Sequence, residues 1–75
     1  MITLTLDLRR LKAERIAKGL TQDEMAIKMG WRTRAPYAKR ENGIISIGAN
    51  ELVKIANILG FTVDELKIFF VNDVL

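Results

Sequence analysis

Apolar residues along the chain recur at helical spacing in several short segments, and a glycine follows most of these segments. The clearest stripe contains Leu52, Ile55, Ala56 and Leu59, which follow the i, i+3, i+4, i+7 pattern of an amphipathic helix. Gly60 comes directly afterwards, where a left-handed residue commonly ends a helix. This segment therefore predicts a helix that buries one face.

The N-terminal part of the chain predicts an earlier helix. Asp7 is a residue type that caps helices, because its carboxylate accepts hydrogen bonds from the first backbone amides. Leu8, Leu11 and Ile16 are the apolar positions that follow, and Gly19 suits the end of the helix.

A second helix is expected to begin at Gln22. The residues Thr21–Glu24 form a capping box, in which the threonine hydroxyl and the glutamate carboxylate each accept a backbone N–H. Met25, Ala26 and Met29 supply its inner stripe, and Gly30 ends it. At about two turns, this helix is too short to be stable without tertiary packing.

The third predicted helix has Thr33 as its N-cap and ends near Asn42 and Gly43. Pro36 is then the third helical residue, within the first turn, where a missing N–H costs little. The tight turn before this helix is Gly30–Arg32.

The two ends of the chain show other patterns. Thr62–Glu65 is a second capping box and opens a short fifth helix that contains Leu66. Ile2–Leu6 alternates between apolar and polar residues, and Ile68–Val71 is an apolar run of high β propensity. We therefore predict one compact all-α domain of five helices over residues 1–75, with a small terminal β-ribbon.

The composition argues against catalysis. The chain contains neither cysteine nor histidine, which removes disulfides, thiolate metal sites and the commonest general base. We expect no enzyme, no metal and no cofactor. The chain has no run of about eighteen apolar residues and no signal-peptide pattern, so we expect a cytoplasmic protein that does not contact a membrane.

The net charge of +3 is unevenly distributed along the chain. Residues 1–42 contain ten basic and five acidic residues, a balance of +5, whereas residues 43–75 contain two basic and four acidic residues, a balance of −2. Such a split suits a protein that presents one end to a polyanion, although an uneven spread also arises by chance.

Two short helices with a tight turn between them point to DNA. The expected helices are Gln22–Met29 and Arg34–Glu41, and the second is the more basic one. In a helix-turn-helix the first helix lies across the phosphates, while the second enters the major groove, where each base pair presents a distinct pattern of donors and acceptors. The core of this unit covers about residues 20–43.

Four stretches occur in a specific order, namely Leu20–Ala26, Met29–Gly30, Tyr37–Gly43 and Leu52–Gly60. Each alone is a weak signal, but the ordered set resembles the Cro/CI (XRE) helix-turn-helix family over about residues 8–66. The resemblance implies a lambda-repressor-like fold and a phage-repressor-like transcriptional regulator that binds double-stranded DNA.

The resemblance also implies roles for single residues. Gln22 matches a glutamine that binds a DNA phosphate at a helix N-terminus, which is a natural anion site. Asn42 matches a phosphate contact beyond the helix end. Arg15 and Glu41 match a salt bridge between the first and third helices, which we expect to be an exposed pair of small energetic value. Tyr37 matches a core residue.

The base-reading positions lie on the third helix. Thr33 matches the residue at the mouth of the groove, Arg34 and Ala35 match the main readers, and Lys39 matches the last of them. A lone basic cluster would usually be a solvated face, but its place on this helix favours DNA. The predicted DNA-contacting residues are Gln22, Arg32, Thr33, Arg34, Ala35, Lys39, Arg40 and Asn42.

The chain departs from the family pattern in three places. The turn is one residue longer, and we place the extra residue at Trp31–Arg32. Trp31 is expected to be a packing residue, and the alternative is that it flanks the DNA backbone. Arg40 stands where an aromatic or aliphatic residue is usual, so either its head reaches a phosphate or the helix is slightly rotated. The loop Ile44–Gly48 lacks the usual phosphate-binding side chains, and Ile27 lies on the expected polar side of its helix.

These apolar positions support an alternative function, a protein-interaction module such as an antitoxin or a repressor modulator. For a DNA-binding function we expect a homodimer, because one recognition helix reads only a few base pairs. The dimer surface should come from the fifth helix and the termini, with strands Ile2–Leu6 and Ile68–Val71 taking part. Its apolar residues are Leu66, Ile68, Phe69, Phe70, Val71, Val74 and Leu75.

Overall fold

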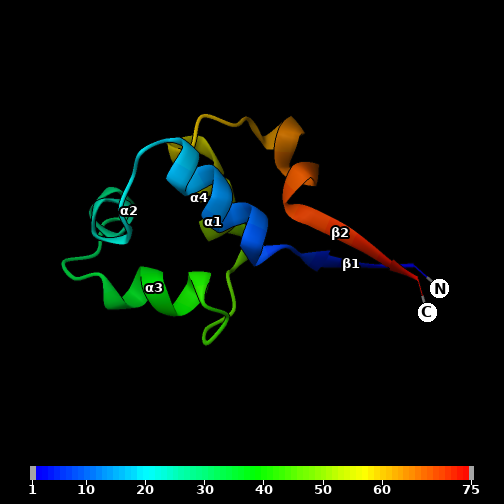
Figure 1. Ribbon diagram of the computed structural model, residues 1–75, viewed down its shortest axis with the longest axis horizontal. Helices are drawn as coiled ribbons and strands as arrows, with labels where there is room; N and C mark the ends of the chain where they lie inside the picture. The colour runs from blue at the N-terminus through cyan, green and yellow to red at the C-terminus, as the bar shows by residue number, and fades with distance from the viewer. Residues whose placement is uncertain (1, 75) are drawn as a thin grey trace.

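The computed structural model of the protein describes the backbone of residues 2–74 and the side chains of residues 4–71. Its elements are β1 (Ile2–Leu6), α1 (Leu8–Ala17), α2 (Gln22–Met29), α3 (Ala35–Glu41), α4 (Ala49–Ile58), the 3-10 helix η1 (Val63–Phe69) and β2 (Phe70–Val74). Figure 1 shows the helices gathered into one body, from which the two strands project as a ribbon. Within the described residues, five helices and a small terminal ribbon confirm the predicted fold class.

Helix α1 begins where the sequence predicts, because the Asp7 carboxylate accepts hydrogen bonds from two backbone amides of the first turn at 3.1 and 3.2 Å. Leu11 is fully buried, as expected for an inner position. The prediction that Ile16 is also an inner position is wrong, since this residue is 58% exposed and Arg15 is buried instead. Arg15 lies one turn after Leu11 and so on nearly the same face of the helix. Ile16 points about 140° away from Leu11.

Helix α2 confirms the predicted capping box. The Thr21 hydroxyl accepts the backbone N–H of Glu24 at 3.0 Å, and the Glu24 carboxylate accepts the backbone N–H of Thr21 at 3.0 Å. Gly30 follows the helix with a left-handed backbone, φ 94°. The predicted inner residues are all buried, namely Met25, Ala26 and Met29.

Helix α3 begins one residue later than predicted, at Ala35. Thr33 is not its N-cap, so that prediction is wrong. The N-cap is Arg34, whose backbone is already helical at φ −68° and ψ −33° and whose side chain makes no capping hydrogen bond. The Arg34 carbonyl accepts the first helical hydrogen bonds, from the N–H groups of Tyr37 and Ala38 at 3.1 and 2.9 Å.

The later start changes the turn. Pro36 is the second helical residue rather than the third, and its missing N–H still costs little because that amide has no partner within the helix. The turn spans Gly30–Arg34, longer than the expected Gly30–Arg32. The placement of the additional residue at Trp31–Arg32 stays a prediction, and the turn contains both of these residues.

Helix α4 buries the predicted stripe of Leu52, Ile55, Ala56 and Leu59 against the other helices. Tyr37 is fully buried, which confirms its place in the core. The core cluster draws on every helix and consists of Leu11, Met25, Ala26, Met29, Tyr37, Ile55, Ala56, Leu59 and Phe69.

The fifth helix is a 3-10 helix that extends to Phe69, so the second strand begins at Phe70 and not at Ile68 as predicted. Phe69 is fully buried and meets Phe61 edge-on, with ring centroids 5.4 Å apart. This packing overrides the β propensity of the segment, because a strand at Phe69 would remove the ring from the core.

Strands β1 and β2 form an antiparallel ribbon in which Leu6 pairs with Phe70 and Ile2 pairs with Val74. The ribbon extends from the end of the helical body opposite α2 (Figure 1). Leu4 is 64% exposed on it, and Val71 is exposed too.

The expected dimer surface is only partly available. Phe69 lies inside the protein's own core and cannot also face a partner. Leu75 and the side chain of Val74 lie outside the described residues. In the described part of the chain, no helix is both long enough and apolar enough to span a bilayer.

Candidate nucleic-acid interface

The exposed side of α3 carries a continuous stripe of predicted contact residues. Ala35, Lys39 and Asn42 are all exposed and follow one another at i, i+4 and i+7, so they lie on one face of the helix and its end. On the opposite face, Tyr37 and Glu41 are buried, one turn apart. The helix therefore presents one face to solvent and anchors the other in the protein.

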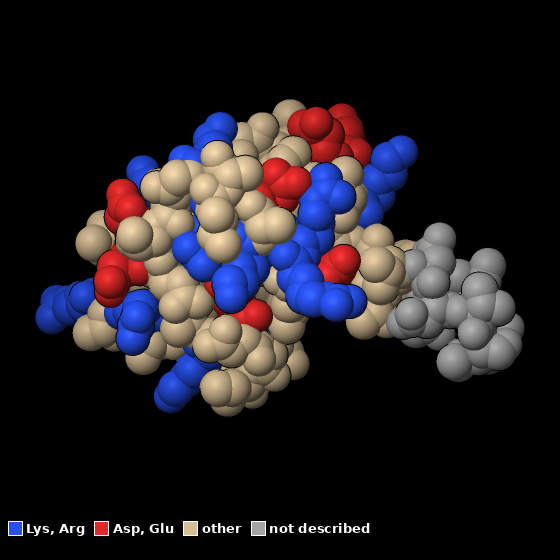
Figure 2. All heavy atoms as spheres, viewed as in Figure 1, with Lys and Arg blue, Asp and Glu red and all other residues tan. Residues whose placement is uncertain are grey.

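The other predicted residues lie at the start of this stripe. Arg32, Thr33 and Arg34 are all exposed in the turn that leads into α3. Figure 2 shows basic side chains spread over much of this face of the molecule, with acidic side chains both on the side of α2 and near η1. The basic residues are therefore not confined to α3, since α1 contains four of them and α3 contains two.

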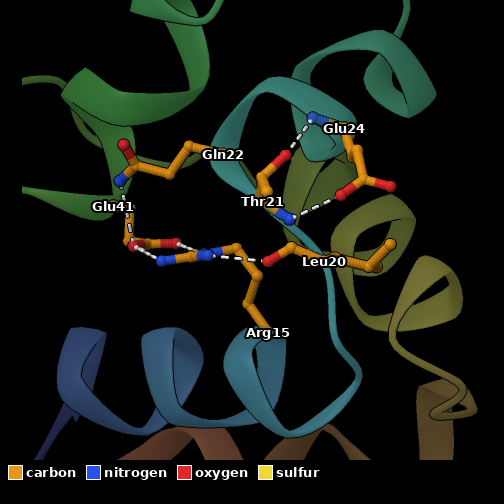
Figure 3. Close-up of polar contacts among 6 residues, drawn as sticks. All are labelled: Arg15, Leu20, Thr21, Gln22, Glu24 and Glu41. Atoms are coloured by element: carbon orange, nitrogen blue, oxygen red, sulfur yellow. Dashed lines mark hydrogen bonds and ion pairs between the residues drawn. The ribbon is translucent and has the colours of Figure 1, made fainter.

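A buried ion pair holds α3 against α1. Arg15 Nε donates to Glu41 Oε2 at 2.8 Å and Arg15 Nη2 donates to Glu41 Oε1 at 3.0 Å, a bidentate contact (Figure 3). The salt bridge is confirmed, but the expectation of an exposed pair is wrong, since only 9% of the Arg15 side chain and 1% of the Glu41 side chain are exposed. Helix α3 packs against both α1 and α2.

Neighbouring groups complete the environment of this pair. Arg15 Nη1 donates to the carbonyl of Leu20 at 2.7 Å, and Gln22 Nε2 donates to Glu41 Oε1 at 3.1 Å. The same carboxylate therefore joins α1, the start of α2 and the end of α3. Figure 3 shows both Arg15 and Gln22 directed at Glu41.

Both members of the pair keep their charge at neutral pH. Burial by itself raises the pKa of Glu41, but the interactions with its polar neighbours, the largest of them the hydrogen bond from Arg15, outweigh burial and lower the pKa below its ordinary value. The hydrogen bond to Glu41 raises the pKa of Arg15. Each charge is thus stabilised by the other, as a buried pair requires.

Gln22, the first residue of α2, is half-buried and held in place by its bond to Glu41. It borders an open hollow of about 600 Å³ whose lining also includes Lys12 and Arg34. Lys12 was not among the predicted residues, because only the fold brings α1 beside the start of α2. The basic residues Lys12, Arg15 and Arg34 and the acidic residue Asp23 therefore line one concave surface at the start of α2.

Arg40 does not share the exposure of the other predicted residues. Its guanidinium bonds to Glu51 and to the carbonyl of Pro36, and it stacks over the ring of Trp31. Trp31 is partly buried against the core, which agrees with its predicted packing role. Of the eight predicted residues, six are exposed, whereas Gln22 and Arg40 are partly buried and make hydrogen bonds within the protein.

A family model described as helix-turn-helix matches residues 11–66, which is most of the chain. This chain belongs to the helix-turn-helix family of the Cro/CI (XRE) type. Searches of curated proteins and of solved structures find no match.

Membership in the helix-turn-helix family assigns a role to each of the helices α2 and α3. The family consists of DNA-binding regulators that are typically not enzymes. Helix α2 is the first helix of the motif and α3 the second, which in such motifs enters the major groove. Among the described residues, no group of three or more acidic side chains is placed to hold a metal ion.

Proposed function

We propose that the chain is a sequence-specific regulator of transcription that acts on double-stranded DNA, as a phage or prophage repressor does, in the cytoplasm. The observation that carries this proposal is the two-sided α3, with Ala35, Lys39 and Asn42 exposed and Tyr37 and Glu41 buried. A recognition helix needs an exposed face and a buried face. The side chains on the exposed face must reach the bases, while the buried face fixes the direction of the helix.

The reading of bases falls to the start and middle of α3. Arg34 can donate two hydrogen bonds to O6 and N7 of a guanine, a contact worth about 1–3 kcal/mol of discrimination. Lys39 reaches a base edge one turn beyond Ala35, whose methyl group can only contact a thymine methyl. Arg32 and Thr33 contact the edge of the groove from the turn.

Phosphate contacts flank this reading face. Gln22 and the first amides of α2 bind one phosphate at the hollow beside Lys12, since a helix N-terminus attracts anions. Asn42 binds another beyond the end of α3. These contacts carry no sequence information but fix the register of the protein on the duplex.

A homodimer supplies the second half-site. Two-stranded ribbons are marginally stable alone, and β1 and β2 present the exposed apolar residues Leu4 and Val71. We place the contact between subunits on this ribbon and the adjoining η1, where Val63 is exposed as well. Each subunit then keeps its α3 away from the interface.

A second candidate is a protein-interaction module, an antitoxin or a repressor modulator, built on the same scaffold. Ile27 on α2 is 68% exposed and Ile44 after α3 is 71% exposed. Such residues beside a basic surface suit a protein partner. They are separate positions rather than a described groove, so DNA remains the better-supported partner.

Binding to mixed genomic DNA at two salt concentrations tests the proposal. Phosphate contacts make the affinity fall steeply with salt, with a slope of about −0.9 per phosphate neutralised. The variant Arg34→Met should lose the preference for a selected sequence, while the control Lys67→Met, on η1, should not. Absence of binding even at low salt would reject the DNA function and favour the protein-interaction module.

A further inference from the structure

Arg40 joins three parts of the fold. Its Nε donates to Glu51 Oε1 at 3.0 Å, its Nη1 donates to the Pro36 carbonyl at 2.8 Å, and its guanidinium carbon lies 4.5 Å from the centre of the Trp31 ring. Only 17% of the side chain is exposed. One flat group therefore contacts the turn before α3, the first turn of α3 and the first turn of α4.

These contacts depend on the shape of a guanidinium. Its face stacks on an aromatic ring while its edge donates several directed hydrogen bonds at once. A lysine ammonium has a similar charge but no plane, so it cannot make the same set of contacts. A side chain that served as a mobile phosphate contact would instead keep its charged head in solvent.

The contacts of Arg40 reach back to the start of α3. This helix has seven residues, and its N-cap Arg34 supplies no capping hydrogen bond. A helix of about two turns is not stable by itself. Side chains lean toward the N-terminus of their helix, and Arg40 accordingly reaches back to Pro36, beside the reader Ala35.

Glu51 connects this arrangement to the core. Its Oε1 accepts hydrogen bonds from Arg40 Nε and from the backbone N–H of Gly48, both at 3.0 Å. The carboxylate that caps α4 therefore also orients Arg40, and the hydrogen bond from Arg40 holds the pKa of Glu51 below its ordinary value. Because α4 buries Leu52 and Ile55, the start of α3 is tied to a helix that packs in the core.

We propose that Arg40, Trp31 and Glu51 form a clamp that sets the direction of the recognition helix on DNA, with Arg40 as a positioning residue rather than a phosphate contact. The proposal rests on the DNA-binding function proposed above. A shift of the first turn of α3 moves the base readers and leaves the number of phosphate contacts unchanged. The clamp therefore controls discrimination between sequences more than it controls overall affinity.

The test compares two probes, a duplex selected by the wild-type chain from a random-sequence pool and mixed genomic DNA. Arg40→Lys keeps the charge and loses the plane, while Glu51→Gln removes a negative charge and keeps an oxygen for the Gly48 amide. Both variants should lose about tenfold in affinity for the selected duplex. Both should bind genomic DNA at least as tightly as the wild type, with the same salt slope.

A matched control uses the exposed pair on α1, in which Arg10 Nε donates to Glu14 at 2.7 Å. Arg10→Lys and Glu14→Gln make the same chemical changes and should leave selectivity unchanged. If Arg40→Lys and Glu51→Gln keep full selectivity, the clamp has no positioning role. If Arg40→Met lowers affinity for both probes equally and reduces the salt slope by about 0.9, Arg40 is a phosphate contact.

Hydrogen exchange in the free protein tests the clamp without DNA. Arg40→Lys and Glu51→Gln should raise the exchange rates of the α3 amides Ala38 and Asn42 about tenfold, while the buried Leu11 amide of α1 is unaffected. Unchanged exchange overturns the clamp. If the wild-type chain binds no DNA, the proposed function fails, and the exchange data still show whether these three residues hold α3.

Discussion

Arg15 and Glu41 meet through two hydrogen bonds of 2.8 and 3.0 Å although 26 positions separate them in the sequence. Their contact fixes the end of α3 to α1, and Gln22 joins it from the start of α2. The pair is buried, so its members depend on one another far more than an exposed pair would.

Removal of one partner should be costly. Arg15→Met leaves Glu41 charged and uncompensated in the interior, and we expect a loss of about 3–5 kcal/mol in the free energy of unfolding. Arg10→Met breaks an exposed pair and should cost about 0–1 kcal/mol. Urea unfolding followed by circular dichroism measures both, and equal losses would contradict the argument.

Replacement of both partners should recover much of this loss. In Arg15→Met with Glu41→Leu no charge remains buried, and well-packed apolar residues often replace an ion pair at little cost. We expect the double variant to be more stable than Arg15→Met alone. If the double variant is less stable than Arg15→Met, the loss of stability comes mainly from removing the ion pair and not from leaving Glu41 without a partner.

The stability of the protein should fall in acid. Because the pKa of Glu41 is lowered in the folded state, its contribution is complete above the ordinary carboxyl value of 4.5 and disappears as the pH falls through the lowered value. Glu41→Gln should therefore flatten the dependence of the unfolding free energy on pH below 4.5. The remaining slope belongs in part to Glu24, Glu51 and Glu65, whose pKa values are also lowered. An unchanged slope in this variant would count against the pair.

Tyr37→Phe should not destabilise the protein. Tyr37 is fully buried and its hydroxyl has no hydrogen-bond partner of good geometry among the described residues. A buried hydroxyl without a partner costs about 1–3 kcal/mol, and its removal should return part of this. Burial raises the pKa of Tyr37, and the neighbouring Glu41 carboxylate raises it further. A loss above about 1 kcal/mol in urea unfolding would indicate a hydrogen bond that this geometry lacks.

Leu4→Glu should abolish the proposed dimer and leave the monomer folded. The residue is 64% exposed on the ribbon, so a charge there disturbs a partner and not the core. Sedimentation at micromolar concentration should show a monomer, whereas the control Ile16→Glu, exposed on α1, should remain dimeric. A wild-type chain that is already monomeric would contradict the dimer proposal itself.

Sequence patterns predicted the features that depend on local chemistry. The caps at Asp7 and Thr21 and the glycine after α2 involve residues only a few positions apart, so their identities are enough. The buried stripe of α4 follows from periodicity alone. The spacing of these elements also predicted that α3 is the second helix of a helix-turn-helix.

The errors come from contacts between distant residues. Thr33 is a good capping residue by type, but α3 starts at Ala35, where Pro36 is held by Arg40. Ile68–Val71 favours a strand, yet the burial of Phe69 extends η1 through its first half. Similarly, the burial of Arg15 and Glu41 arises only when three helices close around them. Periodicity and propensity contain no information on such contacts.

Trp31 is the single tryptophan of the chain, and it lies in the turn that leads into α3 with the Arg40 guanidinium over its ring. Its fluorescence therefore comes from one place, directly before the recognition helix. The emission of an indole changes with the charges and the water around it. The unlabelled protein thus contains its own optical probe of the turn, which can follow DNA binding in a stopped-flow experiment as the helix settles in the groove.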